Sequence, residues 1–499
     1  MSWRSGRRSV RSNVKLLQRA QWLGILATIF MTFASFGAGA IRNRGGVLEA
    51  LGLSFLSYGH GAGISNATLW TAMFCFIVAW ALVGRSLRLS PGMHSVRSLN
   101  RTLLWWVLPL VFAAPILSRD VYSYLMQGAM LRDGFDPYTQ GAAVNPGPML
   151  LEVSHDWRNT TTPYGPLHLW LGEIITSIVG DNVTAGVVLY KLVSLIGFLM
   201  IAWSVPKIAR ELGADPCWAV WLGVMNPVMV FHLVGGMHNE SLMVGLVSVG
   251  IYAALRLRFA LAVVCVAISV SLKATAVFVL PFLVWMATRR LLEVKGGTSR
   301  WHHFVSFVVS GTWMTALTLA VVSAVTWASG ASWGWVSQIS GNSKVINPLA
   351  IPSLLASLMT PVGQLINENL DYNNFLVITR PLSQVMMLAG LVAVWWLFRQ
   401  DRVRAVMGIA AAYTVAVLFN AVTLPWYYTS LLNVVGTFPA QEKLRRITAL
   451  LSMVIAASFA GSGNHMLYNF VWMTSVAVLA WLLTSYVFGA ERPAPNKGD

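Results

Sequence analysis

Apolar stretches long enough to cross a lipid bilayer recur from one end of this 499-residue chain to the other. A bilayer core about 30 Å thick takes roughly 20 helical residues to cross, and only helices or closed barrels satisfy every peptide group inside it. Hydrophobic residues make up 56% of the sequence and charged residues 11%, and the mean hydropathy is +0.63. This composition excludes an ordinary soluble domain. We therefore predict an all-α, polytopic membrane protein.

Hydropathy leaves two regions ambiguous. Residues 259–288 form either one long helix or two short ones broken around Ser271-Leu272-Lys273, and residues 424–438, which open at Pro425, form a short additional span. The clear spans are predicted at residues 21–41, 66–84, 103–117, 186–205, 217–233, 240–255, 303–327, 377–398, 405–421, 447–463 and 469–488.

The distribution of basic residues resolves the ambiguity, because cytoplasmic loops are the ones enriched in Lys and Arg. When both regions are counted as extra crossings, most of the 35 Lys and Arg residues fall on one side and both termini are cytoplasmic. A single crossing at 259–288 would move the basic residues of 289–300 to the outer side. We therefore predict the broken pair and about 14 transmembrane helices, with about 13 as the alternative.

The same pattern predicts the organisation of the chain. A basic cytoplasmic tail covers residues 1–20, a single transmembrane domain covers 21–488 and a polar cytoplasmic tail covers 489–499, with long outer loops at 118–185 and 328–376. The net charge of +17 follows from this topology, because the basic residues are spread over short cytoplasmic loops. They form no single patch with interleaved aromatic residues, which excludes nucleic acid as a partner.

The first outer loop is rich in acidic and aromatic residues. Ser118 is a good N-cap for a helix over residues 119–131, with Asp120 in the first turn. Asp120, Ser123 and Gln127 share one helical face, so this interfacial helix would hold Asp120 at the boundary between lipid and water. The alternative role for Asp120 is to complement the helix dipole.

Further along the loop come the turn-rich segment DGFDPY (133–138) and the segment TPYGPLHLW (162–170), where a second interfacial helix begins and runs through Glu173 toward Thr176. Together with RDVYSY (119–124), these segments resemble polyprenyl-phosphate-sugar-dependent glycosyltransferases of the C superfamily. More narrowly, they resemble the α-1,6-mannopyranosyltransferases that build the mannan core of actinobacterial lipomannan and lipoarabinomannan. Weaker similarity lies in GGMHNE (235–240), SLKATA (271–276) and LPWYY (424–428).

The resemblance implies an enzyme of the plasma membrane whose active site faces away from the cytoplasm. It would move mannose from polyprenyl-phosphate-mannose to a growing α-1,6-mannan or phosphoinositol-mannoside-type lipoglycan acceptor, with inversion at the anomeric carbon. In this family the acidic residue at the start of the first surface helix is the catalytic base, which here is Asp120. A carboxylate within reach can take the proton of a sugar hydroxyl, which is otherwise a poor nucleophile.

Other residues are candidates for contacts with the sugar or the phosphate. Lys273 would hold the lipid phosphate if it lines a cavity, or would extend to the headgroups if it does not. Trp426 and Tyr427 would stack on a sugar or belong to the aromatic belt of the membrane interface. The full set of candidates is Arg119, Tyr122, Tyr124, Asp136, Tyr138, Tyr164, His168, His238, Asn239, Glu240, Lys273, Trp426 and Tyr427.

We predict that no metal or cofactor is required. His155-Asp156 and Asp133…Asp136 could bind a divalent cation, but both are also ordinary turn sequences. The second outer loop, at 328–376, is predicted to act as a lid or acceptor platform. Its polar and aromatic residues include Trp333, Trp335, Gln338, Asn342, Lys344 and Asn347.

Two alternatives remain open from the sequence. A protein O-mannosyltransferase or arabinofuranosyltransferase of the same superfamily would differ in acceptor or donor. A lipid or solute transporter would also have polar groups between helices and broken spans. The sequence shows no inverted repeat, and its acids gather in one outer loop.

Overall fold

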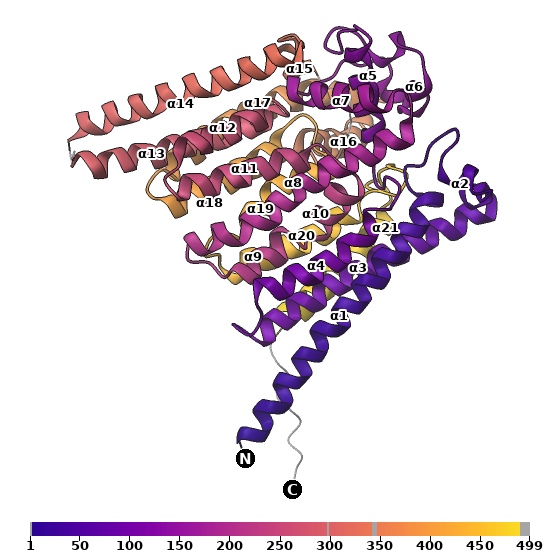
Figure 1. Ribbon diagram of the computed structural model, residues 1–499, viewed down its shortest axis with the longest axis horizontal. Coiled ribbons are helices and arrows are strands. Elements are labelled where there is room, and N and C mark those ends of the chain that lie inside the picture. The colour runs from indigo at the N-terminus through magenta and orange to yellow at the C-terminus, as the bar shows by residue number, and fades with distance from the viewer. Residues whose placement is uncertain (1, 297–298, 342–346, 490–499) are drawn as a thin grey trace.

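The computed structural model describes residues 2–296, 299–341 and 347–489. Within these ranges the chain is all-helical, apart from an isolated bridge between Phe459 and His465. The long helices pack side by side, with α1 (Ser2–Ala38) on one flank and α13 (Leu280–Lys295) and α14 (Arg300–Ser329) on the other (Figure 1). The predicted all-α fold is confirmed.

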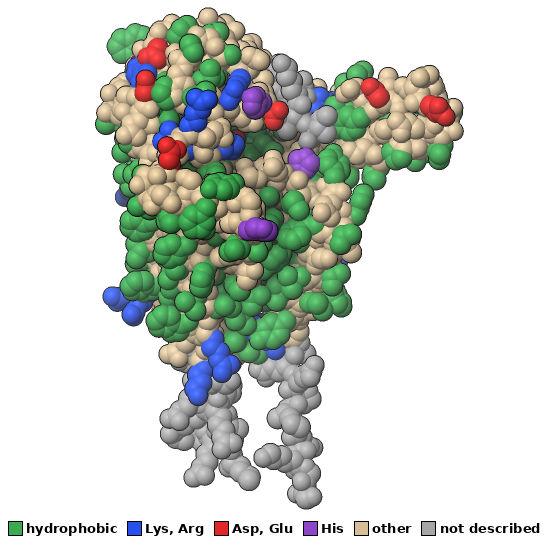
Figure 2. Space-filling view, turned by 90° about the vertical axis from the view of Figure 1, so that its right-hand side faces the viewer, with side chains coloured by type: hydrophobic (Ala, Val, Ile, Leu, Met, Phe, Trp, Pro, Cys, Tyr) green, Lys and Arg blue, Asp and Glu red, His purple; other side chains and the backbone are tan. Residues whose placement is uncertain are grey.

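Eight helices in the described residues are long and apolar enough to cross a membrane. A ninth is possible at Pro216–Gly223 and Pro227–Gly235, which are bent by 51°. Figure 2 shows a band almost free of charged side chains between charged residues at the two ends of the molecule. The eight comprise Lys15–Ala38 of α1, α3 (Gly59–Leu89), α8 (Val183–Glu211), Ala274–Lys295, α14, α17 (Tyr372–Leu397), α18 (Arg402–Phe419) and α21 (Phe470–Phe488).

Shorter helices occupy the other predicted spans. The predicted interruption at Ser271-Leu272-Lys273 is present: α12 ends at Val270, and the chain resumes as a 3-10 turn at Ala274 that leads into α13. The shorter elements are α4 (Val96–Leu110), α9 (Pro216–Gly223), α10 (Pro227–Met229) with the π-helix Val230–Gly235, α11 (Glu240–Leu255), α12 (Phe259–Val270), α19 (Thr429–Val435) and α20 (Glu442–Ala456).

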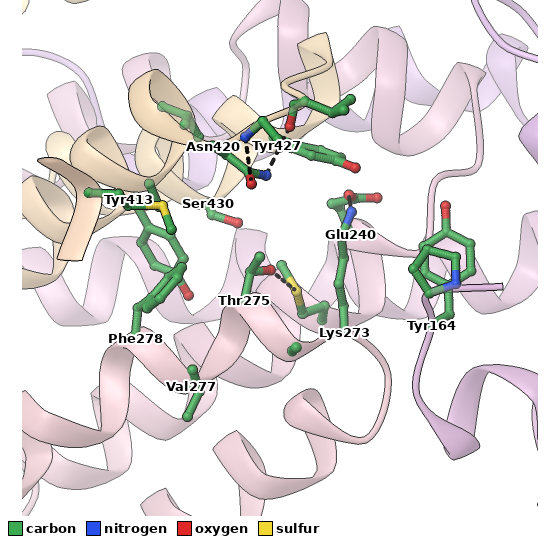
Figure 3. Close-up of a pocket in the computed structure, with 18 of the residues that line it drawn as sticks. Tyr164, Glu240, Lys273, Thr275, Val277, Phe278, Tyr413, Asn420, Tyr427 and Ser430 are labelled. Carbon is green, nitrogen blue, oxygen red and sulfur yellow. Dashed lines mark hydrogen bonds and ion pairs between the residues drawn. The ribbon is translucent and has the colours of Figure 1, made fainter. Parts of the chain in front are cut away.

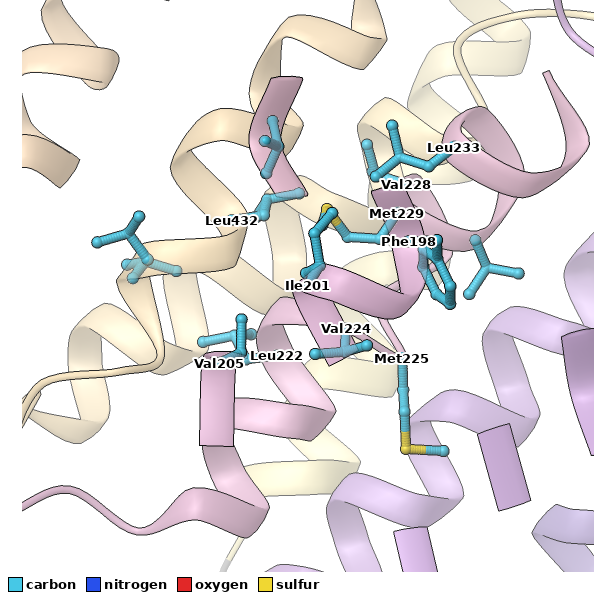
Figure 4. Close-up of a cluster of buried hydrophobic side chains, with 14 of the residues drawn as sticks. Phe198, Ile201, Val205, Leu222, Val224, Met225, Val228, Met229, Leu233 and Leu432 are labelled. Carbon is cyan, nitrogen blue, oxygen red and sulfur yellow. The ribbon is translucent and has the colours of Figure 1, made fainter. Parts of the chain in front are cut away.

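The core lies where α9 and α10 pass through the middle of the bundle. Figure 4 shows Phe198, Ile201 and Val205 of α8 among apolar side chains of residues 222–233 and Leu432 of α19. Nearby, Trp80 and Trp221 stack with centroids 4.4 Å apart. Each indole donates to the backbone carbonyl of the other residue, at 2.9 and 2.8 Å, so neither buried N–H lacks an acceptor.

The helices of the first outer loop gather at the end of the bundle away from the chain termini (Figure 1). They are α5 (Asp120–Arg132), α6 (Pro148–Glu152) and α7 (Pro166–Val179). We predicted that Ser118 caps a helix that begins at residue 119, which is wrong by one residue. The N-cap is Arg119, and the Ser118 hydroxyl oxygen instead accepts from the Asp120 N–H at 3.1 Å, in a local turn ahead of the helix.

The second outer loop contains α15 (Trp335–Gly341) and α16 (Ile351–Gln364). Gln338 of α15 joins it to the first loop, because its amide donates to the Tyr138 carbonyl at 2.9 Å and accepts from the Thr161 hydroxyl at 2.7 Å. Asn342 and Lys344, which we named as part of a lid or acceptor platform, lie outside the described residues.

Candidate functional site

Asp120 opens α5 with its side chain 16% exposed. Its Oδ2 lies 3.4 Å from Nδ1 of His238, and the Tyr124 hydroxyl donates to the same oxygen at 3.5 Å. The Asp120 carboxylate is therefore held at one oxygen by residues from two different segments. This geometry suits a group that must accept a proton in a fixed direction.

A buried ion pair lies close to Asp120. Nζ of Lys273 contacts Oε1 of Glu240, and both residues are more than nine-tenths buried. The Lys273 ammonium also lies over the rings of Tyr427 and Tyr164, 3.8 and 5.7 Å from their centroids. Lys273 is therefore not a side chain that extends to the lipid headgroups, which was one of the two roles considered from the sequence.

The ion pair closes one end of a cavity of about 410 Å³ (Figure 3). Tyr164 and Tyr427 flank that end, while Tyr413 and Phe278 line the opposite end. The walls between them come from α11, the turn before α13, α17 and α18, and most are apolar. A charged head with a long apolar tail would match this division of polar and apolar surface.

The two carboxylate oxygens of Glu240 differ in their contacts. Oε1 contacts Lys273, whereas Oε2 is buried and has no hydrogen-bond partner among the described residues. Buried carboxylate oxygens are normally satisfied. Because Glu240 lines the cavity, its Oε2 is available to a hydroxyl of a bound ligand.

The His168 side chain of α7 packs against residues that surround the site. Nε2 lies 3.1 Å from the Gln127 amide oxygen, and Nδ1 lies 3.5 Å from the Asn239 amide nitrogen. The ring packs edge-on against Tyr124, with centroids 4.7 Å apart. Burial, with a smaller effect of the Lys273 charge, lowers the pKa of His168 to about 3, so this side chain is neutral and acts as a support.

His238 and Trp426 form a stacked pair beside Asp120. Their ring centroids are 3.7 Å apart with planes 17° from parallel, and both residues are buried. Neither is among the described residues that line the cavity, whereas the neighbouring Tyr427 is. Of the predicted site residues, Tyr164, Glu240, Lys273 and Tyr427 line the cavity, whereas Asp120 itself is not among its described lining residues. Tyr124 and His238 contact Asp120, Asn239 lies against His168, and Trp426 lies against His238.

Arg119 and Tyr122 point elsewhere. The Arg119 guanidinium donates to the Glu152 carbonyl at 2.8 Å, to the Ile41 carbonyl at 2.6 Å and to the Glu152 carboxylate at 3.3 Å. The Tyr122 hydroxyl donates to the Ala40 carbonyl at 2.7 Å. These two residues anchor the first outer loop to the segment after α1, and burial raises the pKa of Tyr122.

Asp136 and Tyr138 also lie apart from the cavity. The Asp136 carboxylate accepts from the Tyr138 N–H at 2.9 Å, the bond of an ordinary Asx turn. Tyr138 is buried beneath α15. Tyr138 therefore joins the two outer loops through its carbonyl, whereas Asp136 shapes a turn within the first. Within the described ranges, no three His, Cys, Asp or Glu side chains come together as metal ligands would.

Sequence reasoning missed several features of this site. Gln384 and Asn420 contribute polar atoms to the cavity wall, and their only signal is polarity inside or at the end of an apolar run. Three described residues adopt left-handed backbone without being glycine: Leu117, with φ 65°, Met237, with φ 56°, and Leu257, with φ 61°. The first two directly precede the segments that carry Asp120 and His238, and such strain is often found at functional sites, whereas Leu257 lies in the turn between α11 and α12.

Comparison with known proteins gives the family. A family model described as alpha-(1->6)-mannopyranosyltransferase, N-terminal domain, matches residues 21–289, and an MptB C-terminal domain model matches residues 352–488. A relative from Corynebacterium glutamicum, alpha-(1->6)-mannopyranosyltransferase A, is 56% identical over 93% of this chain and 97% of its own length. The chain belongs to the alpha-(1->6)-mannopyranosyltransferase family.

A second member of this family, alpha-(1->6)-mannopyranosyltransferase A of Mycobacterium tuberculosis, is 35% identical over 92% of this chain and 88% of its own length. The resemblance inferred from the sequence motifs is confirmed. Both matched regions of the mannopyranosyltransferase family contribute to the site. The first supplies Asp120, His238, Glu240 and Lys273, and the second supplies Asn420 and Tyr427 of the cavity wall and Trp426, which stacks on His238.

Proposed function

We propose that this protein is an inverting α-1,6-mannosyltransferase that uses polyprenyl-phosphate-mannose as its donor. The names of its relatives support transfer of mannose to form an α-1,6 linkage. The observation that carries the donor class is the buried Lys273 ammonium at the closed end of an apolar cavity. An ammonium there would attract a phosphate, and the walls would accommodate the first isoprene units of the lipid.

In the proposed reaction Asp120 is the catalytic base. It takes the proton from the 6-hydroxyl of the acceptor mannose as that oxygen attacks the anomeric carbon of the donor. The bond between this carbon and the phosphate oxygen breaks, and the electron pair leaves with polyprenyl phosphate. Attack opposite the leaving group converts a β-linked donor into an α-linked product, and Lys273 stabilises the charge that develops on the phosphate.

We further propose a glycosyltransferase C type fold with about 14 crossings, both termini in the cytoplasm and the active site on the outer face of the plasma membrane. Helices in all the predicted spans and the bias of basic residues support this topology. The acceptor would be a mannan or phosphoinositol-mannoside-type lipoglycan that approaches between the first outer loop and α15. The Gln338 contacts with Tyr138 and Thr161 place these two parts side by side.

No metal or cofactor enters this proposal, because Lys273 supplies the positive charge that a phosphate leaving group needs. A chelator should therefore leave the initial rate within about twofold of the untreated enzyme. Activity that is lost with EDTA and restored by Mg²⁺ or Mn²⁺ would contradict this part.

The decisive experiment measures transfer of labelled mannose from polyprenyl-phosphate-mannose to a synthetic α-1,6-dimannoside. Purified wild type is compared with Asp120→Asn, which keeps the shape of the base and removes its function. The matched control is Asp136→Asn, a first-outer-loop residue in a turn that Asn also supports. We expect Asp120→Asn to lose at least about 100-fold in rate and Asp136→Asn to remain near wild type.

Other outcomes would contradict the proposal. Near-equal rates for Asp120→Asn and wild type would show that Asp120 is not the base. Transfer only from an arabinose donor, or only to a Ser/Thr peptide, would favour the two related transferases. Movement of the lipid across the membrane without any sugar transfer would favour a transporter.

A further inference from the structure

We infer that His238 is the positioning residue of the catalytic base: its Nδ1–H fixes one oxygen of the Asp120 carboxylate. This inference rests on the proposed role of Asp120 as base. It also gives His238 a task different from the sugar or phosphate contact expected from the sequence.

His238 lies next to the Asp120 carboxylate. His238 Nδ1 lies 3.4 Å from Asp120 Oδ2, and His238 is fully buried. Neither ring nitrogen has a hydrogen-bond partner among the described residues. A buried imidazole N–H needs an acceptor, and the Asp120 Oδ2 lies within reach of Nδ1.

The neighbours of Oδ2 also set the direction of the Asp120 carboxylate. The Tyr124 hydroxyl also reaches Oδ2, at 3.5 Å, so the two neighbouring donors converge on the same oxygen. The other oxygen, Oδ1, is thereby left to accept the proton of an acceptor hydroxyl. A base whose orientation is fixed before the substrate arrives loses less freedom in the transition state.

The His238 imidazole is itself held in place by its neighbours. Trp426 stacks on one face with centroids 3.7 Å apart, and Trp426 itself packs edge-on against Phe459. The backbone adds two constraints, because the His238 N–H donates to the His232 carbonyl at 3.3 Å and the His238 carbonyl accepts from the Ser241 N–H at 2.9 Å. The preceding Met237 has a left-handed φ of 56°, a strained conformation that surrounding contacts must maintain.

Other charged and titratable groups surround the pair and would contribute to any pH profile. Each is close enough to Asp120 or His238 to interact electrostatically, or belongs to the ion pair beside them. They are Tyr124, Tyr164, His168, His232, Glu240, Lys273 and Tyr427.

The test exploits the shapes of the two amide side chains. Asn places its amide nitrogen close to the position of Nδ1, whereas Gln places it close to Nε2. We therefore expect His238→Asn to retain activity within about fivefold, and His238→Gln and His238→Phe to lose about 10- to 100-fold in kcat, the loss that follows removal of a hydrogen bond to a charged group.

The readouts separate this inference from the proposed function. If Asp120→Asn is inactive while His238→Phe keeps its kcat, the inference is wrong and the role of Asp120 stands. A raised KM for the donor with unchanged kcat in His238→Phe would instead make His238 a donor contact and overturn the inference. Near-wild-type transfer by Asp120→Asn would overturn the proposed role of Asp120 as base, on which this inference rests.

A second pair of variants covers the case in which His238→Phe does not fold. Trp426→Phe keeps an aromatic face against the imidazole, and Trp426→Leu removes it. We expect the leucine variant to have the lower kcat, with KM for the donor changed little in either. Equal kcat in both variants, with the thermal stability of wild type, would contradict the inference.

Discussion

Lys273 and Glu240 form an ion pair that is almost completely buried, at one end of the cavity. Removing one partner of such a pair leaves an uncompensated buried charge and typically costs about 3–5 kcal/mol. Lys273→Met should therefore lower the thermal stability and abolish transfer together.

The double variant Glu240→Gln/Lys273→Met separates these two effects. Its stability should return most of the way to wild type, because no lone charge remains, while transfer stays absent because the phosphate site is gone. Thermal unfolding and the transfer assay measure the two properties. Full activity in the double variant would contradict the role of Lys273.

Gly128 of α5 touches Gly172 of α7 with no room for a side chain. A Cβ added to Gly128 would lie 2.1 Å from the Gly172 carbonyl carbon, so Gly128→Ala must push α5, and Asp120 with it, away from α7. We expect a loss of about 1–3 kcal/mol in unfolding free energy and a lower rate of transfer. The matched control is Gly63→Ala in α3, where a Cβ meets nothing within 4 Å and alanine should be neutral or slightly stabilising.

Leu117 adopts a left-handed φ of 65° three residues before Asp120. Both Leu117→Ala and Leu117→Gly remove the buried side chain, but only glycine accepts this φ without strain. The glycine variant should therefore be the more stable of the two by about 1 kcal/mol. At Leu103 in α4 the order should reverse, because glycine in a helix interior is less stable than alanine. Chemical denaturation of the four variants measures the difference in stability between alanine and glycine at each position.

His168 makes stability depend on pH in a defined direction. Its pKa falls from about 6.5 in the unfolded chain to about 3 in the folded protein, so between these values the unfolded state binds the extra proton. Stability from this residue is complete above pH 6.5 and is lost progressively as the pH falls toward 3. From pH 7 to pH 5, wild type should lose roughly 2 kcal/mol more than His168→Gln. Parallel losses in the two proteins would contradict the assignment.

Periodicity and charge predict the parts of this fold that depend on local sequence. The apolar spans, the interruption at Ser271-Leu272-Lys273 and the helix that carries Asp120 in its first turn all follow from patterns a few residues to a few tens of residues long. The one-residue error at the start of α5, in contrast, has a non-local cause. The turn at Leu117 and Ser118 is shaped by contacts with distant backbone, since the Leu117 N–H donates to the Gly461 carbonyl at 2.8 Å.

The contacts that make the site could not be predicted in the same way. Asp120 meets His238, and His238 meets Trp426, across long stretches of chain, and only the packing of the whole bundle sets these distances. Arg119 shows that a neighbour of Asp120 in sequence need not be part of the site. It adjoins Asp120 in sequence, yet its guanidinium is bound to Glu152 and Ile41.

The division of the site between the two matched regions has a consequence for biosynthesis. Glu240 and Lys273 are both translated before residue 289, whereas Asn420 and Tyr427 of the cavity wall are translated after residue 352. The nascent chain thus carries both members of the ion pair before the rest of the wall has left the ribosome. The ion pair can therefore become fully enclosed only after the last part of the chain has been made.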